Sequence, residues 1–409
     1  MSQSIAPLKG VKIIDFTMYV AAPAVTSIFG YLGADVIKVE TPKGDPYRGM
    51  GASFGMPVTD DENPLYDTVN GYKRGLSLDM RSEGGKAVMR RLIEQADVFV
   101  TNFRDKALQG MGLTYEEVKA INPRIVYGMG YGYGPEGPDA DRPGYDSTTF
   151  FARSGFAQEA SYVGAAPAVT PSGAGDTVTS ANLGLGILAG LLQARETGMG
   201  CMVSTSLFTS ALWLLQSPIA RRNYNPRPTE PTFYDKPGGM AIFCDFVLKD
   251  ESWVRFCGTT AERYWPDFCK ALGLDEYIED PRFCTSKAQA EHGTEAYELM
   301  AEKLKQKTYE EWHPIFVKYD LPFEKVMGVI EAVNHPQALA NNYATPVEYV
   351  SGKTINFPAP PVQVSTLTDA AKRTTAPKIG EHSREILGNF GYSADEIEAL
   401  IAGGAVKAI

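Results

Sequence analysis

The sequence predicts an α/β protein with a large domain built on a parallel sheet and a smaller α+β domain. In the first half of the chain, short runs of β-branched residues alternate with stretches of helical spacing. Repeated strand–helix–strand units of this kind imply a parallel sheet with helices on its faces. A proline-rich break then separates this half from a region with a different pattern. At about 150 residues per domain, the 409 residues suggest two or three domains.

Each expected element of the first half has a local cause. Strands are expected where β-branched and aromatic residues run together, and helices where apolar residues recur at helical spacing. Gly33 ends the first helix and separates it from the next strand. The expected strands cover residues 11–14, 36–39, 98–101 and 124–127, and the expected helices cover residues 24–32, 83–95 and 177–195.

A change of composition marks the expected domain boundary. Residues 225–239 contain four prolines and end in Gly238 and Gly239, which together break any regular element. The following pattern predicts a hairpin over residues 241–257 and a helix over residues 261–272. Near the end of the chain we expect a strand pair turning at Ser351 and Gly352, and a helix over residues 393–401. The expected domains are therefore 1–224 and 225–330, with 331–409 as a C-terminal segment.

The composition is that of a folded, acidic protein. Hydrophobic residues make up 44% of the chain and charged residues 22%, which is too apolar for a disordered protein. The formal net charge is -10 and no long basic run is present, so neither nucleic acid nor an anionic membrane is an expected partner. The apolar stretches at residues 183–192 and 207–215 are shorter than the roughly 20 residues of a membrane-spanning helix. Residues 1–10 do not resemble a signal peptide, so we expect a cytoplasmic protein.

The five cysteines are widely separated and form no Cys-x-x-Cys pair. Neither disulfides nor a structural zinc site is expected from such spacing, and no other metal site is indicated. We expect single reduced thiols that pack as small apolar residues.

Two glycine motifs are weighed against simpler interpretations. Residues 51–55 match the hydrolase pattern G-x-S-x-G, but flanking prolines and charges favour a surface loop over a strand–helix turn. Gly132, Gly134 and Gly137 spell G-x-G-x-x-G after an expected strand. Three prolines between residues 135 and 143 make the helix of a dinucleotide site implausible, so we expect a long ordered loop there.

Asp176 is the carboxylate with the most unusual setting. It follows Gly173 and Gly175 and precedes an apolar stretch rich in alanine, leucine and glycine. One interpretation is that Asp176 is the N-cap of the expected helix, a common role for a single aspartate. The other is that it is a nucleophile, because an aspartate needs no general base and a glycine-lined approach lets a bulky acyl group reach it. Spacing alone leaves both interpretations open.

Several segments taken together resemble the class III CoA-transferases, a family that includes formyl-CoA and carnitine CoA-transferases. They follow the family's order across essentially the whole chain. Residues 141–155 and 45–70 look most like the members that serve anaerobic amino-acid fermentation, which act on aryl or branched 2-hydroxy acids and the matching enoates, such as phenyllactate and cinnamate. The resembling segments are residues 8–23 (LKGVKIIDFTMYVAAP), 32–40 (LGADVIKVE), 72–80 (YKRGLSLDM), 96–103 (ADVFVTNF), 131–145, 173–176, 198–207 and 376–387 (APKIGEHSREIL).

The resemblance implies that Asp176 is the nucleophile of CoA transfer, forming a mixed anhydride and then an aspartyl-CoA thioester. The implied substrates are an acyl-CoA and a carboxylic acid, with no ATP, no metal and no permanently bound cofactor. Gly238 and Gly239 match a glycine-rich segment that covers the site. The positions that match the family's CoA contacts, each with an ordinary loop or packing role as its alternative, are Val20, Ala21, Arg81, Asn102, Phe103, Met111, Arg142 and Tyr145.

The chain departs from the pattern of some relatives at three positions. Val20 stands where they carry a glutamine, which leaves the thioester oxygen to another group such as backbone amides. Thr41 and Gly110 stand where they carry arginines. Lys43 and Arg104 lie close in sequence and could make the phosphate contacts instead.

Two other functions remain alternatives. An α-methylacyl-CoA racemase of the same superfamily needs a histidine in the segment that matches residues 144–146, where this chain has Tyr145. No histidine precedes His292, so the usual pair of bases cannot be assembled from the first half. A catalytically silent CoA-binding protein would not need Asp176 in its glycine setting.

The resemblance also implies an architecture. The large domain would be Rossmann-like and would be built from the N-terminal half together with the C-terminal segment. Two ring-shaped chains would interlock as a homodimer.

Overall fold

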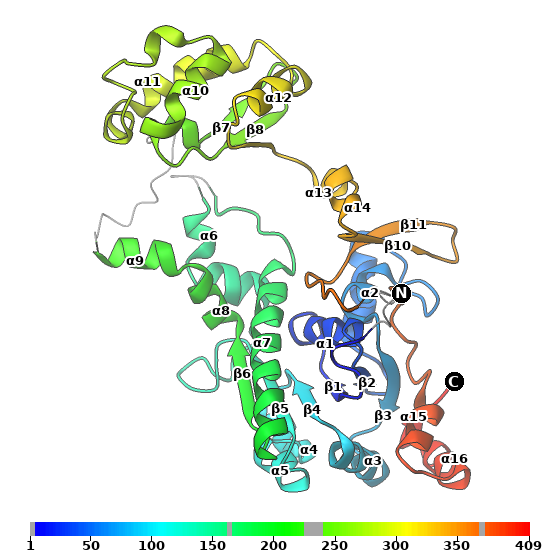
Figure 1. Cartoon of the computed structure of the whole chain (residues 1–409). Coiled ribbons are helices and arrows are strands. Elements are labelled where there is room, and N and C mark those ends of the chain that lie inside the picture. Colours follow the sequence, from blue (N-terminus) through cyan, green and yellow to red (C-terminus); the bar gives the residue numbers. More distant parts are fainter. Residues whose placement is uncertain (1–4, 162–165, 225–239, 368–372) are drawn as a thin grey trace. The chain divides into compact units, whose positions relative to one another are not determined.

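The computed structural model describes residues 5–161, 166–224, 240–367 and 373–409 (Figure 1). The expected boundary at 225–239, with Gly238 and Gly239, lies outside these residues.

The chain divides into two compact units. The short segment Gln158–Ala168 belongs to the smaller unit, which the sequence did not predict. The larger unit comprises Met1–Ala157, Val169–Asn225 and Val333–Ile409, and the smaller unit comprises Gln158–Ala168 and Pro226–Ala332.

The larger unit is built on a seven-stranded sheet with the order β12-β3-β2-β1-β4-β5-β6. Six neighbouring strands are parallel in the order 3-2-1-4-5-6, which is the Rossmann order, and β12 is antiparallel to β3. The predicted parallel sheet is therefore confirmed. The strands are β1 (Lys12–Phe16), β2 (Asp35–Glu40), β3 (Arg74–Leu78), β4 (Val98–Thr101), β5 (Val126–Tyr131), β6 (Met202–Ser206) and β12 (Val406–Lys407).

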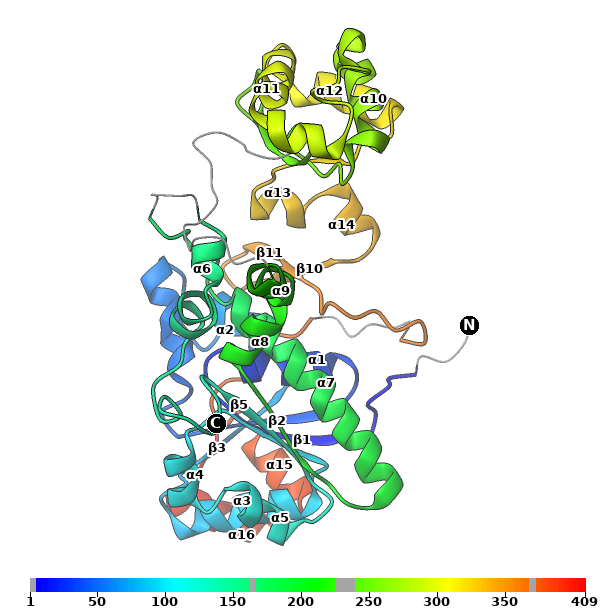
Figure 2. The same ribbon diagram turned by 90° about the vertical axis from the view of Figure 1, so that its left-hand side faces the viewer.

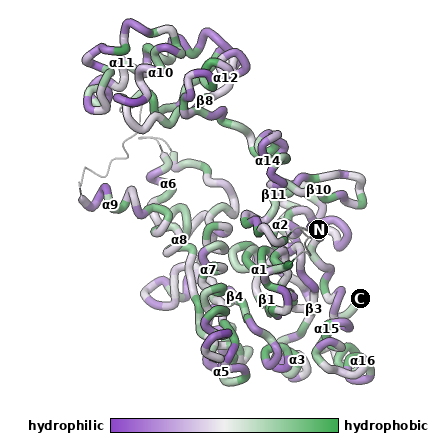
Figure 3. Tube along the Cα trace, viewed as in Figure 1, coloured by the Kyte–Doolittle hydropathy of each residue, from purple (hydrophilic) through white to green (hydrophobic). Residues whose placement is uncertain are grey.

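Helices cover both faces of this sheet, as Figure 2 shows. On one face, α1 (Ala21–Tyr31) and α7 (Ala174–Thr197) enclose a core with Val25, Phe29 and Ile187. Helix α1 and the region of β4 are largely hydrophobic (Figure 3), and β4 is buried because helices cover both faces of the sheet. The opposite face is covered by α3 (Glu83–Gln95), α4 (Asp105–Met111), α5 (Tyr115–Ile121), α15 (Ser383–Asn389) and α16 (Ala394–Ala402).

Among the described helices, α7 is long and apolar enough, by length and composition, to cross a membrane. Its residues Leu183, Ile187 and Leu191 are buried against α1 and the sheet, as in a core helix. Gly184 and Gly190 meet Val25 and Val126 closely, so the helix glycines allow close packing, as the sequence predicts.

Most expected elements agree with the structure. The helices over 83–95 and 261–272 and the strand over 98–101 have the predicted bounds, and the expected strand at 124–127 begins two residues later, at Val126. One prediction is wrong: Asp176 is not the N-cap of α7. The helix begins at Ala174 and its N-cap is Gly173, whose φ of 79° suits glycine. Asp176 therefore lies inside the first turn.

The smaller unit has a three-stranded antiparallel sheet, which contains the predicted hairpin of β7 (Asp245–Val247) and β8 (Trp253–Phe256), together with β9 (Phe323–Lys325). This unit has a core of its own, in which Phe268 of α10 packs on Phe256 and Trp265 packs on Phe283. Its described helices are η3 (Ala241–Phe243), α10 (Ala261–Leu272), η4 (Asp275–Tyr277), α11 (Ser286–Leu304), α12 (Tyr309–Lys318) and α13 (Val329–Val333).

The remaining elements belong to the larger unit, except for the second half of α6 (Phe156–Glu159), which belongs to the smaller one. The predicted strand pair near Ser351 is present as β10 (Ala344–Glu348) and β11 (Thr354–Pro358). Residues 51–55 lie largely in a 3₁₀ helix with Ser53 exposed, where the sequence predicts a surface loop, and this helix is not a turn between a buried strand and a helix. Residues 132–137 form a loop, as expected. The other helices are η1 (Pro46–Phe54), α2 (Pro64–Asn70), η2 (Asp146–Arg153, a π-helix), α6 (Phe156–Glu159), α8 (Leu207–Leu214), α9 (Gln216–Tyr224) and α14 (Pro336–Ala340).

Candidate active site

The strand order of the larger sheet reverses between β1 and β4, and ligands of such sheets bind beyond the carboxyl ends of the strands at this point. The loop after β1 leads through Val20 into α1, and the loop after β4 carries Asn102 and Phe103. The long loop after β5, which includes Tyr145, leads to η2. Residues predicted from sequence as candidate contacts thus gather at one edge of the sheet.

Two aspartates meet at the start of α7. Asp146, the first residue of η2, accepts the N–H of Gly173 at 2.8 Å through Oδ2 and the N–H of Asp176 at 3.1 Å through Oδ1. Asp146 therefore performs the capping role that sequence assigned to Asp176. Because the backbone is satisfied by Asp146, the carboxylate of Asp176 is not used as a cap.

Burial is the main cause that raises the pKa of Asp176, and the negative charge of Asp146 raises it further, to about 7. Burial also raises the pKa of Asp146, although the backbone N–H groups that it accepts act in the opposite direction. At neutral pH, Asp176 is therefore present both as the acid and as a poorly hydrated carboxylate. Such a carboxylate has the properties of a nucleophile in a covalent mechanism.

Glycine is required where the two aspartates meet. A Cβ atom on Gly175 would lie 2.4 Å from Asp146 Oδ1 and 2.3 Å from the ring of Phe150. Phe150 is buried with Phe151 in a small cluster under this helix start. Gly175 thus lets the capping carboxylate and the ring approach the first turn of α7 together.

Three tyrosines and a valine surround the start of α7. Val20 Cγ1 would lie 3.9 Å from a Cβ atom placed on Gly173, so the loop after β1 lies beside the helix N-terminus. The rings of Tyr19 and Tyr145 meet edge to face, with centroids 6.0 Å apart. Burial, followed by the charge of Asp176, raises the pKa of Tyr47 even though its hydrogen bond to Thr68 lowers it, so Tyr47 lies within electrostatic reach of that carboxylate.

Comparison with known proteins decides the family. Residues 8–383 match the model of CoA-transferase family III. The chain belongs to this family. It is 33% identical to an (R)-2-hydroxy-4-methylpentanoate CoA-transferase of Clostridioides difficile over 95% of this chain and 97% of that protein. It is 32% identical to a cinnamoyl-CoA:phenyllactate CoA-transferase of Clostridium sporogenes, with 96% and 95% covered.

Solved structures agree with the fold of this CoA-transferase. A CAIB/BAIF family protein from Brucella suis superposes with a TM-score of 0.81 at 26% identity, covering 95% of this chain and all of that one. A protein from M. tuberculosis superposes with a TM-score of 0.80 at 24% identity, covering 93% and 99%. The second likeness shows the fold alone.

The CoA-contact residues predicted from sequence differ in how the structure uses them. Asn102 accepts the N–H of Met18 at 2.9 Å and donates to the Met18 carbonyl at 2.8 Å. Both the oxygen and the NH₂ group of its side-chain amide therefore hold the loop after β1. Phe103 stacks on Phe16 at 4.5 Å between ring centroids. In these two residues of the CoA-transferase the side chains have the loop and packing roles given as their alternative, and their contact with CoA stays a prediction.

The two predicted arginines are exposed and already paired within the unit. Arg81 contacts Asp79, and Arg142 contacts Asp139 at 2.8 Å and lies over the ring of Tyr133. Exposed pairs of this kind contribute little to stability, so either guanidinium can exchange its partner for a phosphate. Met111 ends α4 and packs on the core, and Ala21 begins α1.

Sequence reasoning missed Asp146 and Tyr47 as parts of the site of this CoA-transferase. Asp146 ends the segment 144–146, where a racemase would need a histidine, and that comparison gives Asp146 no role. Its signal in the sequence was indirect: a helix that starts after Gly173 has no side chain of its own to satisfy its first N–H groups. For Tyr47, which follows Pro46 at the start of η1, we see no signal in the sequence.

Asp176→Asn should stabilise the CoA-transferase at pH 8. Asp176 holds its proton more tightly in the folded protein than in the unfolded chain, where the pKa is about 3.8. Its ionisation therefore costs stability, and this cost grows as the pH rises from about 4 to about 7. Asparagine does not ionise, so we expect a gain in unfolding free energy on the order of 1 kcal/mol at pH 8. The gain should be smaller at pH 5, which thermal unfolding at both pH values measures; equal gains would contradict the raised pKa.

Proposed function

We propose that this CoA-transferase moves CoA from an acyl-CoA to an aryl or branched 2-hydroxy acid, or to the related enoate, through covalent intermediates on Asp176. The observation that carries the proposal is the partly buried Asp176 carboxylate in a glycine-rich helix start, with a pKa of about 7 and a second carboxylate beside it. The choice of acids rests on relatives that are named for 2-hydroxy-4-methylpentanoate and for phenyllactate.

In the proposed reaction, a carboxylate oxygen of Asp176 attacks the thioester carbonyl, the carbon–sulfur bond breaks, and CoA leaves as the thiolate. The thiolate attacks the aspartyl carbonyl of the resulting anhydride and releases the donor acid as its carboxylate. The acceptor carboxylate then attacks the aspartyl-CoA thioester and expels the thiolate. That thiolate attacks the acyl carbonyl of the new anhydride, which gives the new acyl-CoA and restores Asp176. No net proton, ATP or metal is consumed.

Positions named by the family resemblance supply the binding groups in this proposal. The N-terminal N–H groups of α1, beside Val20 and Ala21, stabilise the negative thioester oxygen in place of the glutamine found in some relatives. Arg81 and Arg142 pair with CoA phosphates. The reaction also needs water to be excluded, because an anhydride and a thioester both hydrolyse. Gly238 and Gly239, to which the family resemblance assigns this role, lie outside the described residues.

The choice between aryl and branched acids depends on the side chains that line the pocket for the acid. Four aromatic side chains, Phe150, Phe151, Trp213 and Tyr234, are candidates for shaping this pocket. Phe150 and Phe151 are buried in the core beneath α7, whereas Trp213 is exposed. Tyr234 lies outside the described residues. Trp213 is therefore the described member of this group that is free to contact a ligand or another chain.

The test is mass spectrometry of the protein after incubation with cinnamoyl-CoA or isocaproyl-CoA and trapping with hydroxylamine or borohydride. We expect modification confined to the peptide that contains Asp176, and transfer to phenyllactate or to 2-hydroxy-4-methylpentanoate at a rate that identifies the preferred acid. Formyl-CoA with oxalate serves as the comparison pair, because more distant relatives are named for it. Binding of CoA without modification by any donor would contradict the covalent mechanism.

We further propose a homodimer, and the exposed apolar side of α7 and α8 supports it. Leu185 and Leu192 of α7 are 73% and 68% exposed, and Trp213 of α8 is 68% exposed. Patches of this kind in soluble proteins mark interaction surfaces. A second copy of this chain is the occupant that the family resemblance suggests.

Light scattering should give a particle mass twice the 44.5 kDa of the chain at every concentration at which the protein stays folded. Leu185→Glu with Leu192→Glu should abolish this dimer or prevent folding. The control is Val317→Glu, which changes an exposed apolar residue of α12 in the smaller unit and should leave the mass unchanged. A folded monomer of the unchanged chain on dilution would contradict the proposal.

A further inference from the structure

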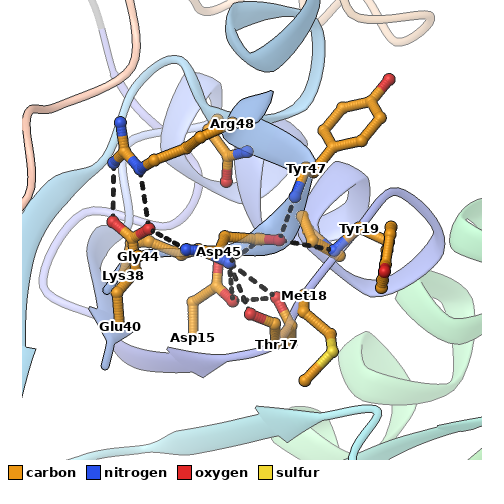
Figure 4. Close-up of polar contacts among 12 residues, drawn as sticks. Asp15, Thr17, Met18, Tyr19, Lys38, Glu40, Gly44, Asp45, Tyr47 and Arg48 are labelled. Carbon is orange, nitrogen blue, oxygen red and sulfur yellow. Dashed lines mark hydrogen bonds and ion pairs between the residues drawn. The ribbon is translucent and has the colours of Figure 1, made fainter. Parts of the chain in front are cut away.

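A buried ion pair lies behind the loop that follows β1. Lys38 of β2 has a fully buried side chain, and its Nζ lies 3.2 Å from Asp45 Oδ2 and 2.6 Å from the carbonyl oxygen of Thr17 (Figure 4). Burial lowers the pKa of Lys38, but the charges of Asp15 and Asp45 outweigh it and hold that pKa above the ordinary lysine value. Lys38 is therefore charged, and the proposed reaction does not use it.

Asp45 connects this lysine to two segments of the site. Its other oxygen, Oδ1, accepts the N–H of Tyr19 at 3.2 Å and the N–H of Tyr47 at 2.9 Å. The backbone N–H of Asp45 donates to Glu40 Oε1 at 2.8 Å, and Arg48 binds both oxygens of Glu40, as Figure 4 shows. One fixed carboxylate thus sets the backbone of both tyrosines.

Tyr19 has a backbone that needs such support. Its φ is 64°, in the left-handed region that a side chain other than glycine rarely occupies. The residue before it, Met18, is held on both its N–H and carbonyl by Asn102, and Thr17 is held by Lys38. Hydrogen bonds on three consecutive residues therefore impose a turn that the free chain would avoid.

This turn lies beside the start of α7. It places the ring of Tyr19 against Tyr145 and Val20 beside Gly173 at the start of α7. The second segment held by Asp45 carries Tyr47, whose pKa responds to the charge of Asp176. A buried ion pair is a weak source of stability, because desolvation offsets the attraction between its charges. The contacts of Asp45 with the backbone of Tyr19 and Tyr47 point to another role for the ion pair, which is to hold these two tyrosines in position.

We propose that Lys38 and Asp45 are positioning residues for CoA transfer, which hold Tyr19 and Tyr47 in place at the Asp176 end of α7. This inference rests on the proposed function and adds residues that do not touch the substrate. Small displacements of groups around a reacting centre lower the catalytic rate strongly: a displacement of 1 Å can lower it about 10²-fold. The pair therefore acts on the catalytic step more than on substrate binding.

The test uses Asp45→Asn, which keeps the shape of the side chain. Asp45 meets hydrogen-bond donors on both sides, Lys38 on one and the two tyrosine N–H groups on the other. Asparagine must turn its NH₂ group toward one side, so it cannot satisfy both. We expect kcat to fall at least about tenfold, and KM for the acyl-CoA to change less than about twofold. Amide hydrogen exchange should become faster in the peptides that contain Tyr19 and Tyr47.

A rescue variant and a matched control sharpen the result. Lys38→Met in the Asp45→Asn background removes the donor on one side, so the amide oxygen can again accept the tyrosine N–H groups, and kcat should recover at least about threefold. The control is Asp35→Asn, which removes one charge of the ion pair between Asp35 at the start of β2 and Arg74 at the start of β3, 2.7 Å apart. This variant should leave kcat unchanged.

The outcomes separate this inference from the proposed function. A kcat within twofold of the unchanged protein in Asp45→Asn, while Asp176→Ala is inactive, would overturn the positioning role alone. Full activity in Asp176→Ala would overturn the covalent mechanism. If Asp45→Asn does not fold, Lys38→Met with Asp45→Ala leaves neither charge of the pair. For this double variant we expect a lower kcat and faster amide exchange in the peptides that contain Tyr19 and Tyr47. If both kcat and the exchange rates were unchanged, the inference would be overturned.

Discussion

Asp176→Ala should lower kcat for CoA transfer by at least about 10⁴-fold, because neither covalent intermediate can form without the carboxylate. The nucleophile is the group through which both halves of the proposed reaction pass, so no neighbouring residue replaces it. CoA binding should persist, since Asp176 lies at the reacting centre and the proposed phosphate contacts lie elsewhere. The measurements are steady-state transfer with a cinnamoyl or isocaproyl donor and calorimetric titration with CoA.

Asp395→Asn is the matched control for this prediction. Asp395 lies in the first turn of α16, as Asp176 lies in the first turn of α7, but it is exposed. Its replacement should leave transfer unchanged, which separates a chemical role from a general effect of charge at helix starts. Transfer by Asp176→Ala at more than a hundredth of the normal rate would exclude Asp176 as the nucleophile.

The parallel sheet was predictable because its signal is local and repeated. Buried parallel strands are continuous apolar runs, such as residues 98–101, and helix α3 has apolar residues at helical spacing. Both have the bounds that the sequence predicts. The start of α7 was not predicted correctly, because Gly173 has no side chain and the group that caps the helix is Asp146, far from it in the sequence. Local pattern cannot supply a partner of that kind.

The candidate site was predictable at Asp176 and much less so around it. The glycines before Asp176 give a local signal, and the family resemblance gives the role. Tyr19 and Tyr47 enter the site through hydrogen bonds to Asp45, which depend on how β1 and β2 pair. The family resemblance names Asn102 as a CoA contact, and the structure adds that its amide holds Met18. Tertiary contacts, which no local spacing encodes, decide these roles.

Gly175→Ala should disable the enzyme with the addition of one methyl group. The new Cβ would lie within 2.5 Å of Asp146 Oδ1 and of two ring atoms of Phe150. Phe150 is 1% exposed and cannot move away without disturbing its buried cluster. The carboxylate of Asp146 must then shift, so the cap of α7 weakens and Asp176 moves. We expect a loss of unfolding free energy of about 1–3 kcal/mol and a fall of at least about 10²-fold in kcat.

Gly388→Ala provides the comparison that isolates this steric effect. Gly388 also lies within a helix, α15, but a Cβ atom there would meet nothing within 4 Å. Alanine has the higher helix propensity, by about 1 kcal/mol, so this variant should be as stable as the unchanged protein or more stable. Thermal unfolding and kcat measured on both variants therefore test the same substitution with and without a close neighbour. If Gly175→Ala retained normal kcat, the close approach of Asp146 to the first turn of α7 would not be needed for the reaction.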